Sequence, residues 1–166
     1  MMLYIGLLAD DTIRRHDLLI EDVALRLAEV LSLAERHLQD AASDTISVEA
    51  KHNVAYAAAR VVAEAVMLAE GYRPGRRMGK HAAVFRFLAV ACGGRWSAQA
   101  RYFDSARKKR NESEYERTGT VTLHEMSGVI AEATRFLADV TAWLLAAHPE
   151  YNSNEVPPGP PNEEIP

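Results

Sequence analysis

The fold is decided most clearly by residues 122–147, which read TLHEMSGVIAEATRFLADVTAWLLAA. Apolar side chains recur there at steps of three and four, the spacing that places them on one face of an α-helix; they are Met126, Ile130, Ala133, Leu137, Val140 and Leu144. Thr122 and Glu125 precede this run with the spacing of a capping box, which starts a helix. The segment therefore predicts a long amphipathic helix that must pack against other helices.

The same periodicity predicts helices over residues 18–42, 48–70 and 80–92, and another that begins after Ser97 and runs to Tyr115. Ser47 and Ser97 are expected to act as N-caps. Gly71 and the pair Gly93-Gly94 follow the second and third helices, where glycine commonly ends a helix. No segment alternates with period two over a useful length, so no sheet is predicted. The expected fold is all-α, an up-and-down bundle of four to five helices over residues 1–148.

Residues 149–166 are rich in proline and glutamate and contain little that can be buried. They are therefore expected to be a disordered acidic tail. The chain has 48% hydrophobic and 25% charged residues, ordinary values for a globular protein. The apolar run Leu3–Ala9 is too short to span a bilayer, which favours a cytoplasmic protein without membrane association. The single cysteine, Cys92, lies in an apolar run and is expected to be a small buried hydrophobe.

Positive charge is concentrated in one quarter of an acidic chain. The formal net charge is −4, yet residues 71–110 hold eleven Lys and Arg and one acid, Asp104, a local net charge of +10. The basic residues are Arg73, Arg76, Arg77, Lys80, Arg86, Arg95, Arg101, Arg107, Lys108, Lys109 and Arg110. Such a concentration predicts a surface for a polyanion or for an acidic partner protein.

The basic quarter ends in Arg107-Lys-Lys-Arg-Asn-Glu-Ser-Glu-Tyr115. On a helix, Arg107, Asn111 and Tyr115 lie at i, i+4 and i+8 and share one stripe, next to Arg110. A guanidinium, an amide and a phenol on one edge can together hold a phosphate group. The simpler interpretation is that these charges only solvate one face of the helix.

Motifs of other chemistries are missing. The chain has no glycine-rich phosphate loop, no HExxH or CxxC pair and no GxSxG elbow, and its six histidines are scattered. Neither a metal nor a cofactor is predicted.

Three features resemble the HEPN superfamily of all-helical domains. The second helix carries Ala55-Tyr-Ala-Ala-Ala and ends near Gly71-Tyr-Arg73, the next helix opens near His81, and a later helix bears Arg110-Asn111. The resemblance covers about residues 18–145. It implies a homodimer that places an R-x(4–6)-H motif from each subunit beside a common cleft.

In ribonuclease members of that superfamily the arginine holds the scissile phosphate, and the histidine assists attack by the ribose 2′-hydroxyl without metal. The resemblance thus implies an RNA- or nucleotide-binding homodimer, a metal-independent endoribonuclease of toxin–antitoxin or phage-defence systems, with a nucleotidyltransferase antitoxin as partner. Carried onto this chain, the catalytic residues are Arg110, Asn111 and Tyr115. The phosphate-binding residues are Arg107, Lys108, Arg73, Arg76, Arg77, Lys80 and His81.

The chain departs from the motif where Tyr115 stands in place of histidine. A phenol with a pKa near 10 is a poor general base at neutral pH. Literal R-x(4–6)-H matches at Arg76–His81 and Arg117–His124 do not lie on one continuous helix and are interpreted as chance. Two alternatives stay open: an inactive module that docks an acidic partner through its basic region, and a bundle that binds a small ligand beside the small-residue stripe of the second helix.

Overall fold

The structure is a computed structural model that describes residues 4–76, 79–115 and 121–152. Its five long helices are α2 (Ile20–Ala41), α3 (Val48–Ala69), α4 (Lys80–Val90), α5 (Ser97–Tyr115) and α6 (Leu123–Ala147). A short helix α1 (Ile5–Ala9) and strand β1 (Ile13–Arg15) precede them. Strand β2 (Tyr72–Pro74) lies between α3 and α4, the 3-10 turn η2 (Ala91–Gly94) between α4 and α5, and the 3-10 turn η3 (Pro149–Tyr151) follows α6. The predicted all-α bundle is confirmed, with helix ends within about two residues of those expected.

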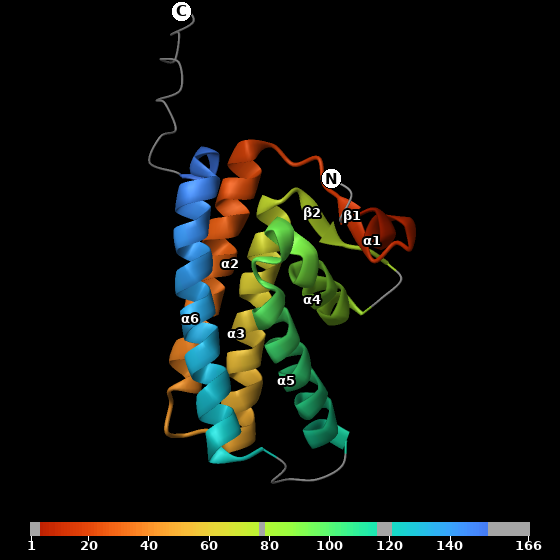
Figure 1. The fold of residues 1–166 in the computed structure, drawn as a ribbon. Coiled ribbons are helices and arrows are strands. Elements are labelled where there is room, and N and C mark those ends of the chain that lie inside the picture. The colour runs from red at the N-terminus through yellow and green to blue at the C-terminus, as the bar shows by residue number, and fades with distance from the viewer. Residues whose placement is uncertain (1–3, 77–78, 116–120, 153–166) are drawn as a thin grey trace, which may run out of the picture.

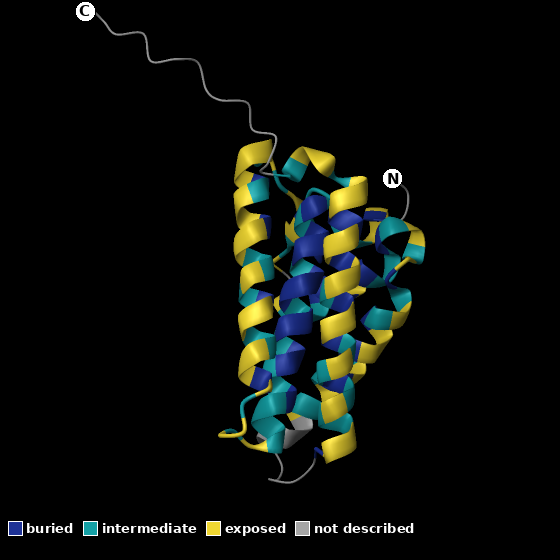
Figure 2. Cartoon of the chain, turned by 90° about the vertical axis from the view of Figure 1, so that its left-hand side faces the viewer, coloured by how far each residue is buried: buried dark blue, intermediate teal, exposed yellow. Residues whose placement is uncertain are grey.

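Helix α3 is the centre of the bundle, with α2 and α6 on one side and α4 and α5 on the other (Figure 1). In Figure 2 it is the dark-blue helix between neighbours whose outward faces are yellow. Its twelve buried residues include six alanines, and small side chains let neighbouring helices approach closely. The sequence predicted one small-residue stripe, whereas the helix is buried nearly all round, as expected for a helix without a wide polar face.

The capping predictions have different outcomes at the individual helices. The Thr122 hydroxyl accepts from the Glu125 N–H at 3.1 Å and Glu125 Oε2 accepts from the Thr122 N–H at 2.8 Å, so the capping box is confirmed. Ser47 caps α3 through the Ala50 N–H. Ser97 is not an N-cap, because α5 already begins at that residue and the Trp96 carbonyl accepts the first helical hydrogen bond.

The prediction that the chain has no sheet is wrong. Strands β1 and β2 form an antiparallel pair in which Arg14 lies opposite Arg73. Each has three residues, too few for an alternating pattern to appear in the sequence. The pair ends where Gly75 meets the turn after α1: a Cβ at Gly75 would lie 1.9 Å from the Asp11 carbonyl oxygen, so only glycine fits there.

Cys92 lies in the reversal between α4 and α5, where it, Gly93 and Gly94 all have positive φ. Its side chain is half-buried rather than fully buried. Burial raises the pKa of the thiol to about 11, so the group stays protonated at neutral pH, as expected of a structural cysteine.

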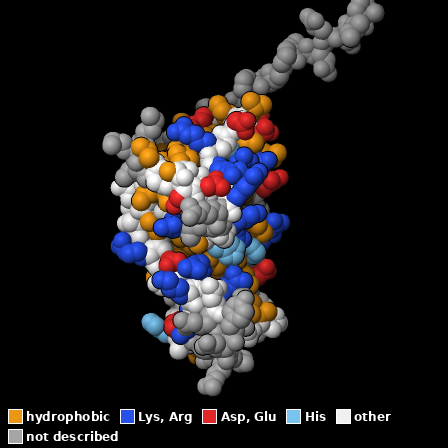
Figure 3. All heavy atoms as spheres, turned by 90° about the vertical axis from the view of Figure 1, so that its right-hand side faces the viewer, with side chains coloured by type: hydrophobic (Ala, Val, Ile, Leu, Met, Phe, Trp, Pro, Cys, Tyr) orange, Lys and Arg blue, Asp and Glu red, His pale blue; other side chains and the backbone are white. Residues whose placement is uncertain are grey.

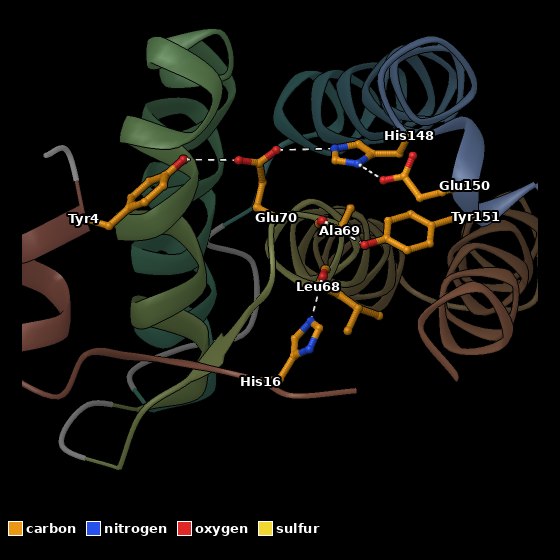
Figure 4. Close-up of polar contacts among 8 residues, drawn as sticks. All are labelled: Tyr4, His16, Leu68, Ala69, Glu70, His148, Glu150 and Tyr151. Atoms are coloured by element: carbon orange, nitrogen blue, oxygen red, sulfur yellow. Dashed lines mark hydrogen bonds and ion pairs between the residues drawn. The ribbon is translucent and has the colours of Figure 1, made fainter. Parts of the chain in front are cut away.

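Side chains from both ends of the chain form hydrogen bonds with the last carbonyl groups of α3 (Figure 4). His16 Nε2 donates to the Leu68 carbonyl at 2.9 Å, and the Tyr151 hydroxyl donates to the Ala69 carbonyl at 3.4 Å. These contacts satisfy carbonyls that a helix end leaves without intrahelical partners. Tyr151 belongs to η3, so the described fold continues past residue 148; the remaining predicted tail, residues 153–166, lies outside the described residues.

Candidate functional site

Three helices bring basic and aromatic side chains together at the middle of the bundle. Arg110 of α5 lies over the ring of Tyr56 of α3, with its Cζ 5.7 Å from the ring centroid. The ring of His81, at the start of α4, has its centroid 6.3 Å from that of Tyr56. Arg60 of α3 and Arg107 of α5 lie close enough to affect the pKa of both rings. We call these five residues the basic cluster.

Tyr56 forms the base of the basic cluster. Its side chain is fully buried, and its hydroxyl has no hydrogen-bond partner among the described residues. Burial raises the pKa of the phenol to about 12, although Arg107, Arg110 and Arg60 act in the opposite direction. The phenol therefore stays protonated, and its ring face supports the guanidinium of Arg110 through a cation–π contact.

His81 is held in its neutral form. Burial lowers the pKa of its imidazole, and the positive charges of Arg60, Arg110 and Arg107 lower it further. A neutral imidazole beside guanidinium groups has a free lone pair that can accept a hydrogen bond or a proton. Neither property was visible from the sequence, which gave His81 only a phosphate-binding role.

Acidic side chains compensate part of the positive charge. Arg60 is paired with Glu64 one turn further along α3. Asp104 accepts from Arg107 Nε at 2.9 Å and lies 3.3 Å from Lys108 Nζ. Burial acts to raise the pKa of Asp104, but the hydrogen bonds from both cations lower it overall, so the carboxylate is ionised.

The structure separates the other predicted site residues into several places. Arg73 and Lys80 line a cavity between α2, α3 and β2, to which Arg60 also contributes. Arg76 is exposed beside Asp11, whose Oδ2 accepts from the Arg76 N–H at 3.4 Å. Lys108 and Asn111 are exposed on α5. Tyr115 ends α5, but its side chain lies outside the described part, as does Arg77.

Two members of the basic cluster, Tyr56 and Arg60, were missed by sequence reasoning. A signal was present: Arg60 is the single arginine of the alanine-rich second helix, and Tyr56 precedes it by one turn, on the same face. The sequence does not tell which helices flank that face, so this pair could equally belong to a binding site or be an ordinary charge on the surface.

Figure 3 looks onto the side of the molecule that carries α4, α5 and the two strands, where several groups of lysine and arginine side chains lie among carboxylates and apolar side chains. Within residues 4–76, 79–115 and 121–152, no group of three or more His, Cys, Asp or Glu side chains is placed to hold a metal ion. None of the helices described has the length and apolarity needed to cross a bilayer.

The fold and the cluster define an α-helical bundle in which α3, α4 and α5 together form a basic, histidine-containing cluster. Comparison with protein-family models, with curated proteins and with solved structures gave no match. The resemblance to the HEPN superfamily therefore depends on the quoted motif residues and on the helical fold alone.

Proposed function

We propose that this protein is a HEPN-type homodimer that binds RNA or nucleotide phosphates at the basic cluster and cleaves RNA without metal. The observation that carries the proposal is the convergence of three guanidinium groups, Arg60, Arg107 and Arg110, around a neutral imidazole. Guanidinium forks match the geometry of phosphate oxygens. Arg110 and the adjacent Asn111 are the residues that also carry the family resemblance.

In this mechanism Arg107 and Arg110 hold the scissile phosphate and stabilise the charge that develops on it. His81 accepts the proton of the ribose 2′-hydroxyl, whose oxygen attacks phosphorus. The bond from phosphorus to the 5′-oxygen breaks, that oxygen takes up a proton from water, and His81 returns its own proton to the solvent. The products are a 2′,3′-cyclic phosphate and a 5′-hydroxyl. The pKa of His81 is low for the reason given above, so the imidazole is available as a base at neutral pH.

The test is incubation of the purified protein with a labelled single-stranded RNA in EDTA, with binding measured as a function of salt. The expected result is cleavage that ends in cyclic phosphate, and binding that falls steeply as salt rises. The double change Arg107→Ala/Arg110→Ala is expected to lower the magnitude of the salt slope by about 1 to 2, since each lost phosphate contact removes about one unit. His81→Asn is expected to abolish cleavage but keep binding.

Arg135→Ala is the matched control, because Arg135 is exposed on α6 and paired with Glu132. Wild-type protein that binds neither RNA nor nucleotide at low salt would rule out the proposal. Cleavage that stays at the wild-type level in both His81→Asn and Arg107→Ala/Arg110→Ala, as it should in Arg135→Ala, would contradict the role given to the basic cluster.

A second candidate function is docking of an acidic partner, as the resemblance implies for a nucleotidyltransferase antitoxin. It is favoured by a groove of about 430 Å³ between α4 and α5. Its lining combines alanine and phenylalanine side chains with four cations, Arg86, Arg101, Arg107 and Lys108, and one acid, Asp104. Co-expression with a neighbouring nucleotidyltransferase tests this: Arg86→Glu/Arg101→Glu is expected to abolish co-purification and to leave RNA cleavage in place.

A further inference from the structure

A cavity between α2, α3 and β2 lies apart from the groove between α4 and α5. It has a volume of about 730 Å³ and is lined by residues of α2, α3, β2 and the first turn of α4. Cavities of this size commonly hold small molecules, in which an apolar lining buries the body of the ligand and a few polar groups orient it.

The lining contains a continuous apolar part. Met67 of α3 is 1% exposed, and Val30 of α2 and Leu68 of α3 are half-buried beside the same core. These three side chains come from two helices that pack along their lengths. A flat or branched apolar group placed against them would lose its contact with water, which favours binding.

The charged part of the lining is predominantly positive. Arg60 and Glu64 form an ion pair within the wall, so they largely compensate each other. Arg73 and Lys80 are exposed at the β2 and α4 side, and the ion pairs found among the described residues include neither of them. Across the opening, Arg26 and Glu29 of α2 add one charge of each sign.

From this arrangement we infer that the cavity binds a small organic anion with an apolar body, such as an aromatic carboxylate. The anionic head lies against Arg73 and Lys80, and the apolar body lies over Val30, Met67 and Leu68. Inorganic phosphate lacks a group that would cover the apolar part, and a neutral aromatic compound lacks the attraction to the two cations. Both are therefore weaker ligands than an anion that combines the two features.

The inference is independent of the proposed ribonuclease activity, because its ligand, its apolar lining and the cations Arg73 and Lys80 are separate from His81, Arg107 and Arg110. The cavity and the basic cluster share only Arg60, whose guanidinium is paired with Glu64.

The experiment uses the full chain and the fluorescent probe 8-anilino-1-naphthalenesulfonate, an aromatic anion whose emission rises in apolar surroundings. The expected result is saturable binding of the probe. Indole-3-acetate should displace the probe, whereas its neutral counterpart indole-3-acetamide and inorganic phosphate should not. Val30→Trp, which fills the cavity, and Arg73→Ala/Lys80→Ala, which removes the head-group contacts, are each expected to weaken binding about tenfold.

Arg36→Ala is the control, since Arg36 is exposed on α2 and does not line the cavity. Unfolding midpoints are measured in parallel to detect any variant that disturbs the fold. If Val30→Trp does so, Arg73→Ala/Lys80→Ala still tests the cavity, because both of its changes are at exposed residues. Probe binding that is absent, or that stays unchanged in Arg73→Ala/Lys80→Ala, would overturn the inference. Probe binding that survives in Arg107→Ala/Arg110→Ala separates this cavity from the RNA site.

Discussion

The two halves of helix α3 use polar residues in opposite ways. At its C-terminal end, Glu70 connects Tyr4 and His148, with oxygen–oxygen and oxygen–nitrogen distances of 3.5 and 3.4 Å, while His16 and Tyr151 bind the final carbonyls (Figure 4). At its middle, the buried hydroxyl of Tyr56 has no partner among the described residues, and Arg110 lies over its ring with Arg60 and Arg107 nearby.

The C-terminal end of α3 contributes to stability, whereas the middle of α3 has the capacity to bind a ligand. Polar groups that satisfy one another hold helices together and leave nothing for a ligand. The unpartnered buried hydroxyl of Tyr56 reduces stability, because it lacks the hydrogen bond that it made with water in the unfolded chain. Such an arrangement is typical of a site that a bound group completes.

The largest expected effect comes from removing the ring at the centre of the basic cluster. Tyr56→Ala should reduce the free energy of unfolding by about 3–5 kcal/mol, since a fully buried aromatic side chain leaves a cavity. Tyr56→Phe keeps the ring and removes only the unpartnered hydroxyl, so it should stay within about 0.5 kcal/mol of wild type or exceed it. Urea unfolding measures both. A large loss of stability in Tyr56→Phe would show that the hydroxyl is bonded.

The contacts at the C-terminal end of α3 should respond differently. Glu70→Ala leaves His148 and Tyr4 without their shared carboxylate and should reduce the free energy of unfolding by about 1–3 kcal/mol. RNA binding should be unchanged. Glu150→Ala is the matched control, because Glu150 binds the other ring nitrogen of His148 from an exposed position. Loss of RNA binding in Glu70→Ala would break the contrast between the two halves.

Arg110→Ala should have the opposite effects to Glu70→Ala, with little change in stability and a loss of RNA affinity. A cation–π contact at a half-exposed position contributes about 0.5–1 kcal/mol, so thermal unfolding should change little. RNA affinity should fall together with the salt slope, as a phosphate contact is lost. Equal affinity in the variant and wild type would place Arg110 among the structural residues.

The smallest effect expected is a pH dependence of stability. Burial lowers the pKa of His52, which is 1% exposed, and burial with three nearby arginines lowers that of His81, from an ordinary value of 6.5. As the pH falls through about 6.5, these two histidines take up protons in the unfolded chain but stay neutral in the folded chain. The free energy of unfolding should therefore be highest above about pH 7 and should fall as the solution is acidified through about pH 6.

His52→Gln should flatten this dependence, measured as unfolding midpoints across the same pH range. His124→Gln is the control because His124 is exposed on α6. A midpoint that rises on acidification would contradict the assigned direction of both pKa shifts.

The site was predictable only in part. Arg107, Arg110 and His81 were named from charge and motif, and the structure brings them together. Arg73 and Lys80 were named with them but line a different cavity, and Arg76 lies beside Asp11. Spacing along a chain does not tell which loop residues turn toward which helix, because a loop has no fixed period.

The helices and most of their ends follow from local signals in the amino-acid sequence. Apolar periodicity, the Thr122–Glu125 capping box and the glycines after α3 and α4 act within a few residues of one another, so they can be recognised without a structure. The positions of Tyr56 and Arg60 near His81 and Arg110, and the pairing of β1 with β2, depend on the tertiary fold. Those relations join segments that are distant in the chain, and packing around the alanine-rich α3, rather than local preference, sets them.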